Sequence, residues 1–234
     1  MKTLVIVPAY NEEASIAGVI KDVQSLGLGY DVVVVNDGSG DRTREKALRA
    51  GVVVLSHPIN LGIGAAMQTG FRYAVRYHYN CAVQVDGDGQ HPAQEIPKLV
   101  DALETTKADV VIGSRFLEGE GFQSTFSRRV GIRYFEFLHR LLTRVRITDC
   151  TSGFRALNRK ALTIADHYYP DEYPEAESIV LFAKNDLAIH EVPVSMRERQ
   201  GGVSSIGRFV GLYYMFKVTL AIVFTHLRLT KGGK

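Results

Sequence analysis

Two carboxylates stand side by side where a buried strand is expected to end. In VQVDGDGQHP, residues 83–92, the residues up to Val85 run directly into Asp86 and Asp88, which a single glycine separates. Like charges this close repel each other and raise each other's pKa unless a cation lies between them. With the side-chain carbonyl of Gln90, they offer hard oxygen ligands that suit Mg²⁺ or Mn²⁺ and leave positions for phosphate oxygens. We therefore predict a divalent metal site.

A second acidic turn, NDGSGDRT, occupies residues 36–43. Asp41 is placed to cap the following helix, with its negative charge at the positive end of that helix. Asp37 is not needed as a cap, because it stands at the end of the preceding strand. We predict that its carboxylate accepts hydrogen bonds from the base or ribose of a nucleotide.

The loop PAYNEE, residues 8–13, allows a structural and a ligand-binding interpretation. Pro8 would stop a strand, and Asn11 would cap the next helix. Spacing alone therefore leaves a ligand role for Tyr10 or Glu12 open. The glycines of NLGIGAAMQTGF match neither the dinucleotide-binding pattern nor the P-loop, and the acidic turn lacks the spacing of an EF-hand.

Short apolar runs alternate with segments of helical spacing through the first half of the chain. This alternation predicts an α/β fold with a mainly parallel sheet covered by helices on both faces. The carboxyl ends of the strands then share one edge, so the polar loops converge on one site. We expect one domain over residues 1–200. The runs are residues 4–7, 32–35, 52–55, 82–85 and 109–113, and the helical segments are 14–26, 42–50, 65–77 and 93–105.

Bulk properties exclude several classes of protein. The net charge of +3 is too small to indicate a nucleic-acid binder. Cys81 and Cys150 match no CxxC spacing, so we expect two reduced core thiols. The first apolar run is too short for a signal peptide, and we therefore expect the protein in the cytoplasm or peripherally on the cytosolic face of a membrane.

Six motifs in this order and spacing resemble the family 2 glycosyltransferases of the GT-A fold. Within them the sequence is most similar to the dolichyl-phosphate mannose synthase-like branch, which transfers a sugar from a nucleotide donor to a polyprenyl phosphate. The resemblance covers residues 1–200. The motifs are VPAYNEE, VNDGSGDRT, NLGIGAAMQTG, VDGDGQHP, VIGSRF and DCTSGFRALNR.

The resemblance implies roles for particular residues. It implies inverting transfer from a UDP- or GDP-linked sugar, with Asp88 and Arg115 as the catalytic residues and Arg115 near the transferred phosphate groups. Asp86, Asp88 and Gln90 match its metal and diphosphate motif, for Mg²⁺ or Mn²⁺. The nucleoside-contacting positions correspond to Pro8, Ala9, Tyr10, Glu12 and Asp37.

The acceptor implied by the resemblance needs cations rather than a base. A phosphate monoester is already an anion at neutral pH and can attack without general-base help. Residues 127–147 contain six arginines and one glutamate at helical spacing. We predict that this amphipathic segment meets anionic lipid headgroups, with Arg129 and Arg133 binding the acceptor phosphate. The alternative is a solvated face of a packed helix.

The C-terminal segment, residues 201–234, favours association of the protein with a membrane. Residues 209–227 are largely apolar, but Lys217 near their middle makes a lone spanning helix costly. We expect an interfacial or oligomerising helix, with a pure core helix as the alternative. The partner of this helix would be a second copy of the same chain or a small membrane protein.

Two rival functions stay open. A transferase that acts on a saccharide hydroxyl would need a general base, for which YPEAES offers Glu175 and Glu177. A non-catalytic nucleotide-sugar-binding subunit would show no transfer at all.

Overall fold

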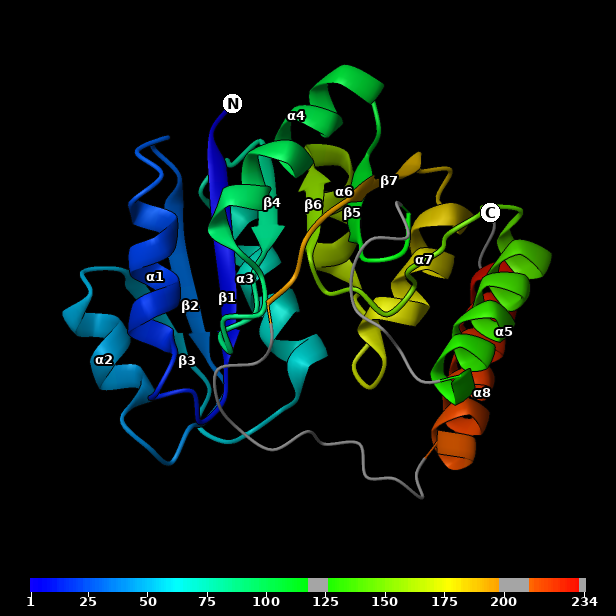
Figure 1. The fold of residues 1–234 in the computed structure, drawn as a ribbon, viewed down its shortest axis with the longest axis horizontal. Coiled ribbons are helices and arrows are strands. Elements are labelled where there is room, and N and C mark those ends of the chain that lie inside the picture. The colour runs from blue at the N-terminus through cyan, green and yellow to red at the C-terminus, as the bar shows by residue number, and fades with distance from the viewer. Residues whose placement is uncertain (118–125, 198–210, 232–234) are drawn as a thin grey trace.

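Seven strands form one mainly parallel sheet in the computed structural model, which describes residues 1–117, 126–197 and 211–231 (Figure 1). The strands are β1 (Thr3–Ala9), β2 (Asp31–Asn36), β3 (Val53–Ser56), β4 (Cys81–Gln84), β5 (Val110–Ser114), β6 (Arg155–Asn158) and β7 (Ile189–Pro193). Their order across the sheet is β3-β2-β1-β4-β6-β5-β7. The first five match the predicted apolar runs, so the predicted fold class is confirmed.

The strands β6 and β7 were not predicted. β6 is antiparallel to both β4 and β5, and β7 pairs in parallel with β5. Arg155 interrupts the apolar pattern of β6, and His190 and Glu191 interrupt that of β7. Because β6 separates β4 from β5, these two strands are not neighbours. They still run in the same direction, and their carboxyl ends lie at the same edge of the sheet.

Helices cover both faces of the sheet, as predicted. They are α1 (Ile16–Gln24), α2 (Thr43–Arg49), α3 (Ile63–Arg76), the 3-10 turn η1 (Ala93–Glu95), α4 (Ile96–Thr106), α5 (Phe126–Thr143), α6 (Arg159–His167), α7 (Pro174–Lys184) and α8 (Gly211–Lys231). Along β1, Val5 and Val7 pack into the core under α1 and α4, and Leu4 and Ile6 pack into the core under α3, α6 and α7. Each fully buried aliphatic side chain of this kind stabilises the fold by about 1.5–3 kcal/mol.

The C-terminal helix α8 packs beside α5 and against α7 (Figure 1). Val218 and Ile222 are buried in the same core as α3 and α6. The hydroxyl of Thr225 donates a buried hydrogen bond of 2.7 Å to the carboxylate of Glu177 on α7. One stripe of α8 therefore belongs to the domain core. Among the described helices, none combines the length and the apolarity needed to cross a bilayer.

Candidate active site

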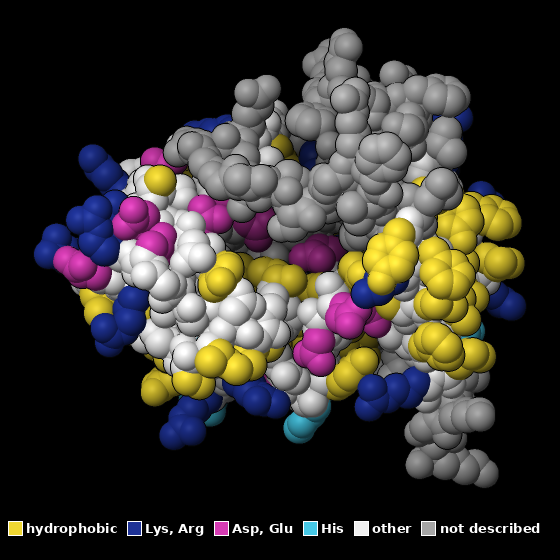
Figure 2. Space-filling model, turned by 90° about the horizontal axis from the view of Figure 1, so that it is seen from below, with side chains coloured by type: hydrophobic (Ala, Val, Ile, Leu, Met, Phe, Trp, Pro, Cys, Tyr) yellow, Lys and Arg dark blue, Asp and Glu magenta, His cyan; other side chains and the backbone are white. Residues whose placement is uncertain are grey.

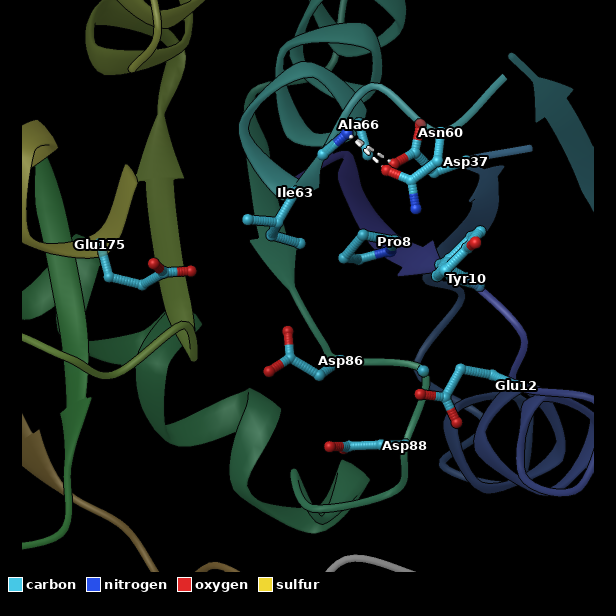
Figure 3. Close-up of a pocket in the computed structure, with 13 residues that line it drawn as sticks. Pro8, Tyr10, Glu12, Asp37, Asn60, Ile63, Ala66, Asp86, Asp88 and Glu175 are labelled. Carbon is cyan, nitrogen blue, oxygen red and sulfur yellow. Dashed lines mark hydrogen bonds between the residues drawn. The ribbon is translucent and has the colours of Figure 1, made fainter. Parts of the chain in front are cut away.

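The acidic loop, residues 86–91, follows β4 and brings two carboxylates to the edge of the sheet. Asp88 is buried, and its Oδ1 accepts a hydrogen bond of 3.0 Å from the backbone N–H of Gln90. A Cβ atom on Gly87 would lie 3.0 Å from the carbonyl oxygen of Pro8, so glycine allows the loop to pass close to β1. The carboxyl groups of Asp86 and Asp88 point to the same side of the loop (Figure 3).

His91 supports this loop from within the protein. Its Nδ1 accepts a hydrogen bond of 3.0 Å from the backbone N–H of Asp86, which places the ring proton on Nε2. Nε2 lies 3.7 Å from the Asp86 carboxylate, and the ring stacks on Phe154 with centroids 4.7 Å apart. His91 is therefore a packing residue that fixes the backbone of the acidic loop.

The loops after β1 and β2 hold each other in place. The backbone N–H of Asn11 donates to the hydroxyl of Ser39, and the Asn11 Oδ1 accepts from the N–H of Gly40. The N–H of Glu12 donates to the hydroxyl of Thr43 at 2.8 Å. The prediction that Asn11 caps the first helix is wrong, because Asn11 adopts a left-handed conformation with φ 55° and bonds the neighbouring loop instead.

Asp41 was predicted to cap α2, but the N-cap residue is Arg42, so Asp41 stands one residue before the predicted position and still reaches the first turn of the helix. Its carboxylate accepts from the backbone N–H of Thr43 at 2.9 Å and from that of Glu13 at 3.1 Å. Burial acts to raise the pKa of Asp41, but these hydrogen bonds outweigh burial, and the pKa lies below its ordinary value. The carboxylate thus stabilises the helix and joins the two loops.

Asp37 organises the turn that follows β3. Its buried carboxylate accepts hydrogen bonds from the ring of His57 at 2.7 Å and from the backbone N–H groups of Leu61 and Gly62 at 2.9 and 2.8 Å. The other ring nitrogen of His57 lies 2.9 Å from the hydroxyl of Thr69. Sequence reasoning missed this support, since nothing in the spacing of His57 ties it to Asp37.

These loops enclose a pocket of about 420 Å³ at the carboxyl edge of the sheet (Figure 3). Seven predicted site residues line it: Pro8, Ala9, Tyr10, Glu12, Asp37, Asp86 and Asp88. The remaining lining residues are Asn60, Gly62, Ile63, Ala66, Gly87 and Glu175. The structure therefore brings together most of the predicted site from three different strand ends.

Glu175, from the first turn of α7, closes the side of the pocket opposite Tyr10 (Figure 3). Burial raises the pKa of its carboxyl, and the negative charge of Asp86 adds to this effect while Arg155 opposes it. Arg155 is 1% exposed, and its guanidinium donates to the Glu175 carbonyl oxygen and to the hydroxyl of Ser178, both at 2.7 Å. Arg155 was not predicted as a site residue. A charged residue within an otherwise apolar strand is the sequence feature that could have identified it.

Arg115 does not line the pocket. It forms a bidentate ion pair with Asp149 at 2.7 and 2.8 Å, and it donates to the hydroxyl of Thr151. The backbone N–H of Asp149 in turn donates to the half-buried carboxylate of Glu191. This chain of contacts fixes Arg115 near the site, where the charge of Asp86 still acts on it.

Two further predicted residues do not line the pocket, and the side chain of a third lies outside the described part of the chain. Gln90 belongs to the acidic loop but is not a lining residue. Arg133 is exposed on α5, and the side chain of Arg129 lies outside the described residues. In the described part of the chain, no three His, Cys, Asp or Glu side chains come together as a metal site.

Comparison with known proteins agrees with this geometry. Residues 4–164 match the family model for glycosyl transferase family 2. The chain is 32% identical over 227 residues to polyprenol monophosphomannose synthase of Mycolicibacterium smegmatis, covering 93% of this chain and 85% of the relative. It is 31% identical over 210 residues to the UDP-N-acetylglucosamine–dolichyl-phosphate N-acetylglucosaminyltransferase of Methanococcus voltae, covering 81% and 83%.

The fold also has solved counterparts. Glucosyl-3-phosphoglycerate synthase from Mycobacterium tuberculosis, crystallised with Mn²⁺, UDP and glucosyl-3-phosphoglycerate, superposes with a TM-score of 0.72 at 22% identity, over 100% of this chain and 81% of that chain. This likeness establishes the GT-A fold. With the family model matched over most of its length, the chain belongs to glycosyl transferase family 2 and is a glycosyltransferase.

Proposed function

We propose that the chain transfers a sugar, with inversion, from a UDP- or GDP-linked donor to a polyprenyl phosphate of the dolichyl or undecaprenyl type, at the cytosolic face of a membrane. One observation carries the donor assignment: a single pocket has Tyr10 and Asp37 at one side and Asp86 and Asp88 next to them, toward its middle. This arrangement suits a nucleoside followed by a diphosphate. The names of the relatives above support the acceptor class.

The acidic pair fits a divalent cation. Mg²⁺ is commonly held by one or two carboxylates together with substrate phosphates, so a third acidic ligand from the protein is not required. Asp86 and Asp88 would hold Mg²⁺ or Mn²⁺, with Gln90 as the further candidate ligand. A bound cation would supply positive charge next to the departing diphosphate.

The transfer itself is a displacement at the anomeric carbon of the donor sugar. An oxygen of the acceptor phosphate attacks this carbon from the face opposite the donor diphosphate, and the bond to the diphosphate breaks with its electron pair left on the diphosphate. Arg115, locked by Asp149, adds fixed positive charge near Asp86. Such preorganised charge lowers the barrier because it needs no rearrangement during the reaction.

The membrane assignment rests on the apolar face, which we define as the exposed side chains of Tyr134, Phe137, Leu141, Tyr213, Phe216, Leu220, Phe224 and Leu227. Figure 2 shows hydrophobic side chains gathered where α5 and α8 lie. The hydroxyls of Tyr134 and Thr219 are 3.1 Å apart, so the two helices present one surface. The exposed Arg133, Arg140 and Arg228 suit anionic headgroups. With Arg129, Arg133 stays our candidate for the acceptor phosphate.

A saccharide hydroxyl is the second candidate acceptor. It is favoured by one observation, the carboxyl of Glu175 in the pocket, because a hydroxyl nucleophile needs a base. Glu177 is less suited to that role, since its carboxylate accepts from Thr225 and from the backbone N–H of Tyr173.

Radiolabelled nucleotide sugars, incubated with the full chain and vesicles containing polyprenyl phosphate, test the proposal. We expect label in the organic phase with Mg²⁺ or Mn²⁺, loss of transfer with EDTA, and a fall of about 100-fold or more in Asp88→Asn. Label appearing only in a water-soluble glycan would overturn the lipid acceptor. Undiminished transfer in EDTA would overturn the proposed requirement for a divalent metal ion.

A further inference from the structure

The donor proposed above has three parts, and the pocket has three regions in the same order. Asp37 and Tyr10 lie at one side, Asp86 and Asp88 in the middle, and Glu175 at the opposite side (Figure 3). If the nucleoside lies at the first region and the diphosphate at the second, the sugar extends toward the third. Glu175 is the lining residue with an ionisable side chain on that side.

The position of Glu175 is fixed by the protein. Arg155 donates to its carbonyl oxygen and also to that of Cys150 and to Ser178, which ties the start of α7 to the segment before β6. A Cβ on Gly64 would lie 2.1 Å from the carbonyl oxygen of Pro170, so the start of α3 is pressed against the chain leading into α7. The backbone of Glu175 is therefore held in place beside the pocket that its side chain lines.

We propose, on the basis of the proposed function, that Glu175 hydrogen-bonds a hydroxyl group of the transferred sugar and thereby determines which sugar the enzyme accepts. A carboxyl group accepts hydrogen bonds from sugar hydroxyls, and its neutral form also donates one. Burial raises the pKa of Glu175, which increases the share of that form. A site built to bind a hydroxyl discriminates strongly against a sugar that lacks it in the right place, because the hydrogen-bonding group of the site is then left unpaired.

Calorimetry on the full chain with Mn²⁺ distinguishes the contribution of the sugar to binding affinity from that of the nucleotide. The probes are UDP and GDP alone, and UDP-glucose, UDP-galactose, UDP-N-acetylglucosamine and GDP-mannose. We expect Glu175→Ala to weaken binding of the preferred nucleotide sugar by about tenfold while leaving the affinity for its nucleoside diphosphate unchanged. Unchanged nucleotide binding also shows that the variant is folded. Glu175→Gln, which keeps both hydrogen-bonding functions, should stay within about threefold of the wild type.

Turnover with the same panel gives a second readout. The preference of Glu175→Ala for its best sugar over the next best should fall about fivefold or more, because the discriminating contact is lost. Glu177→Gln is the matched control on the same helix, since its side chain faces Thr225, and it should keep the wild-type preference.

Different outcomes overturn different claims. Failure of the wild type to bind any nucleotide sugar would overturn the proposed function itself. If nucleotide sugars bind normally but Glu175→Ala weakens UDP or GDP equally, or changes neither affinity nor sugar preference, the inference about Glu175 is wrong. It is also wrong if Glu175→Gln binds donor normally and loses turnover by 100-fold, since that pattern identifies a general base.

Discussion

At the scale of single residues, buried charges near this site are held by dense hydrogen bonding. Asp149 is fully buried and bonds Arg115 through both carboxylate oxygens. Arg155 is as deeply buried and is surrounded by carbonyl and hydroxyl oxygens. A buried charge is tolerated only when such partners replace water. These residues therefore fix the geometry of the site at a cost that the surrounding contacts must offset.

Asp149→Asn tests the anchoring of Arg115. The change removes one partner of a buried ion pair, and breaking such a pair costs about 3 kcal/mol or more because the other charge is left uncompensated. We expect a loss of this size in the free energy of unfolding, measured by urea denaturation, together with slower sugar transfer. The matched control is Glu45→Gln, which breaks the exposed pair of Glu45 with Arg49 and should cost less than about 1 kcal/mol. Equal losses for both variants would contradict the anchoring role.

At the scale of elements, close contacts between helices and loops bring the walls of the pocket together. The second residue of α3 is Gly64, which touches the backbone of Pro170 and Asp171. An added methyl group there meets backbone atoms that cannot move aside as a flexible side chain would. The approach of α7 to α3, and with it the position of Glu175, depends on this glycine.

Gly64→Ala should destabilise the protein by about 2 kcal/mol and weaken nucleotide-sugar binding, because overpacking forces the backbone apart. Gly18→Ala in α1 is the paired control: an added Cβ there meets nothing within 4 Å. In a helix, that replacement should stabilise the protein by about 0.5–1 kcal/mol. Urea denaturation of both variants measures the difference. A stabilised Gly64→Ala variant would show that the contact is loose.

Glu177 on α7 should make stability depend on pH. Burial raises its pKa above the ordinary 4.5, so its contribution to stability is fully present below that value and is lost as pH rises through the folded-state pKa. Glu177→Gln removes this loss, and we expect its Tm to exceed that of the wild type by about 2 °C or more at pH 8, with a smaller difference at pH 4.5. Glu45→Gln, at an exposed position on α2, is the control. A pH-independent difference would contradict this account.

At the scale of the whole molecule, the α5 and α8 pair stands at one side of the sheet and presents the apolar face outward (Figure 1, Figure 2). The other side of α8 is buried through Val218 and Ile222. Contiguous exposed apolar surface on a folded protein marks an interaction site. On α8 no acidic residue is present, so its charge suits an anionic lipid surface and gives no attraction to a basic protein partner.

Phe137→Gln and Phe224→Gln test this face. Each residue is 64% exposed, and transfer of its side chain out of water contributes about 1.5–3 kcal/mol. Each substitution should therefore weaken binding to phosphatidylglycerol-containing vesicles by about tenfold in a flotation assay. Leu48→Gln, an exposed apolar position on α2, should bind like the wild type. If vesicle binding is unchanged and the Phe variants instead dissociate a dimer in sedimentation velocity, the face is an interface between two copies.

The sequence by itself determined the strands β1 to β5, their covering helices and seven residues of the pocket. These depend on local patterns, since a continuous apolar run is a buried strand and a polar loop after it lies at the carboxyl edge of a parallel sheet. Only the tertiary structure decided the antiparallel β6, the pairing of Arg115 with Asp149, the support of Asp37 by His57, and the arrival of Glu175 at the pocket. Each of these joins residues from distant segments, and burial of a polar group depends on partners that no local periodicity encodes.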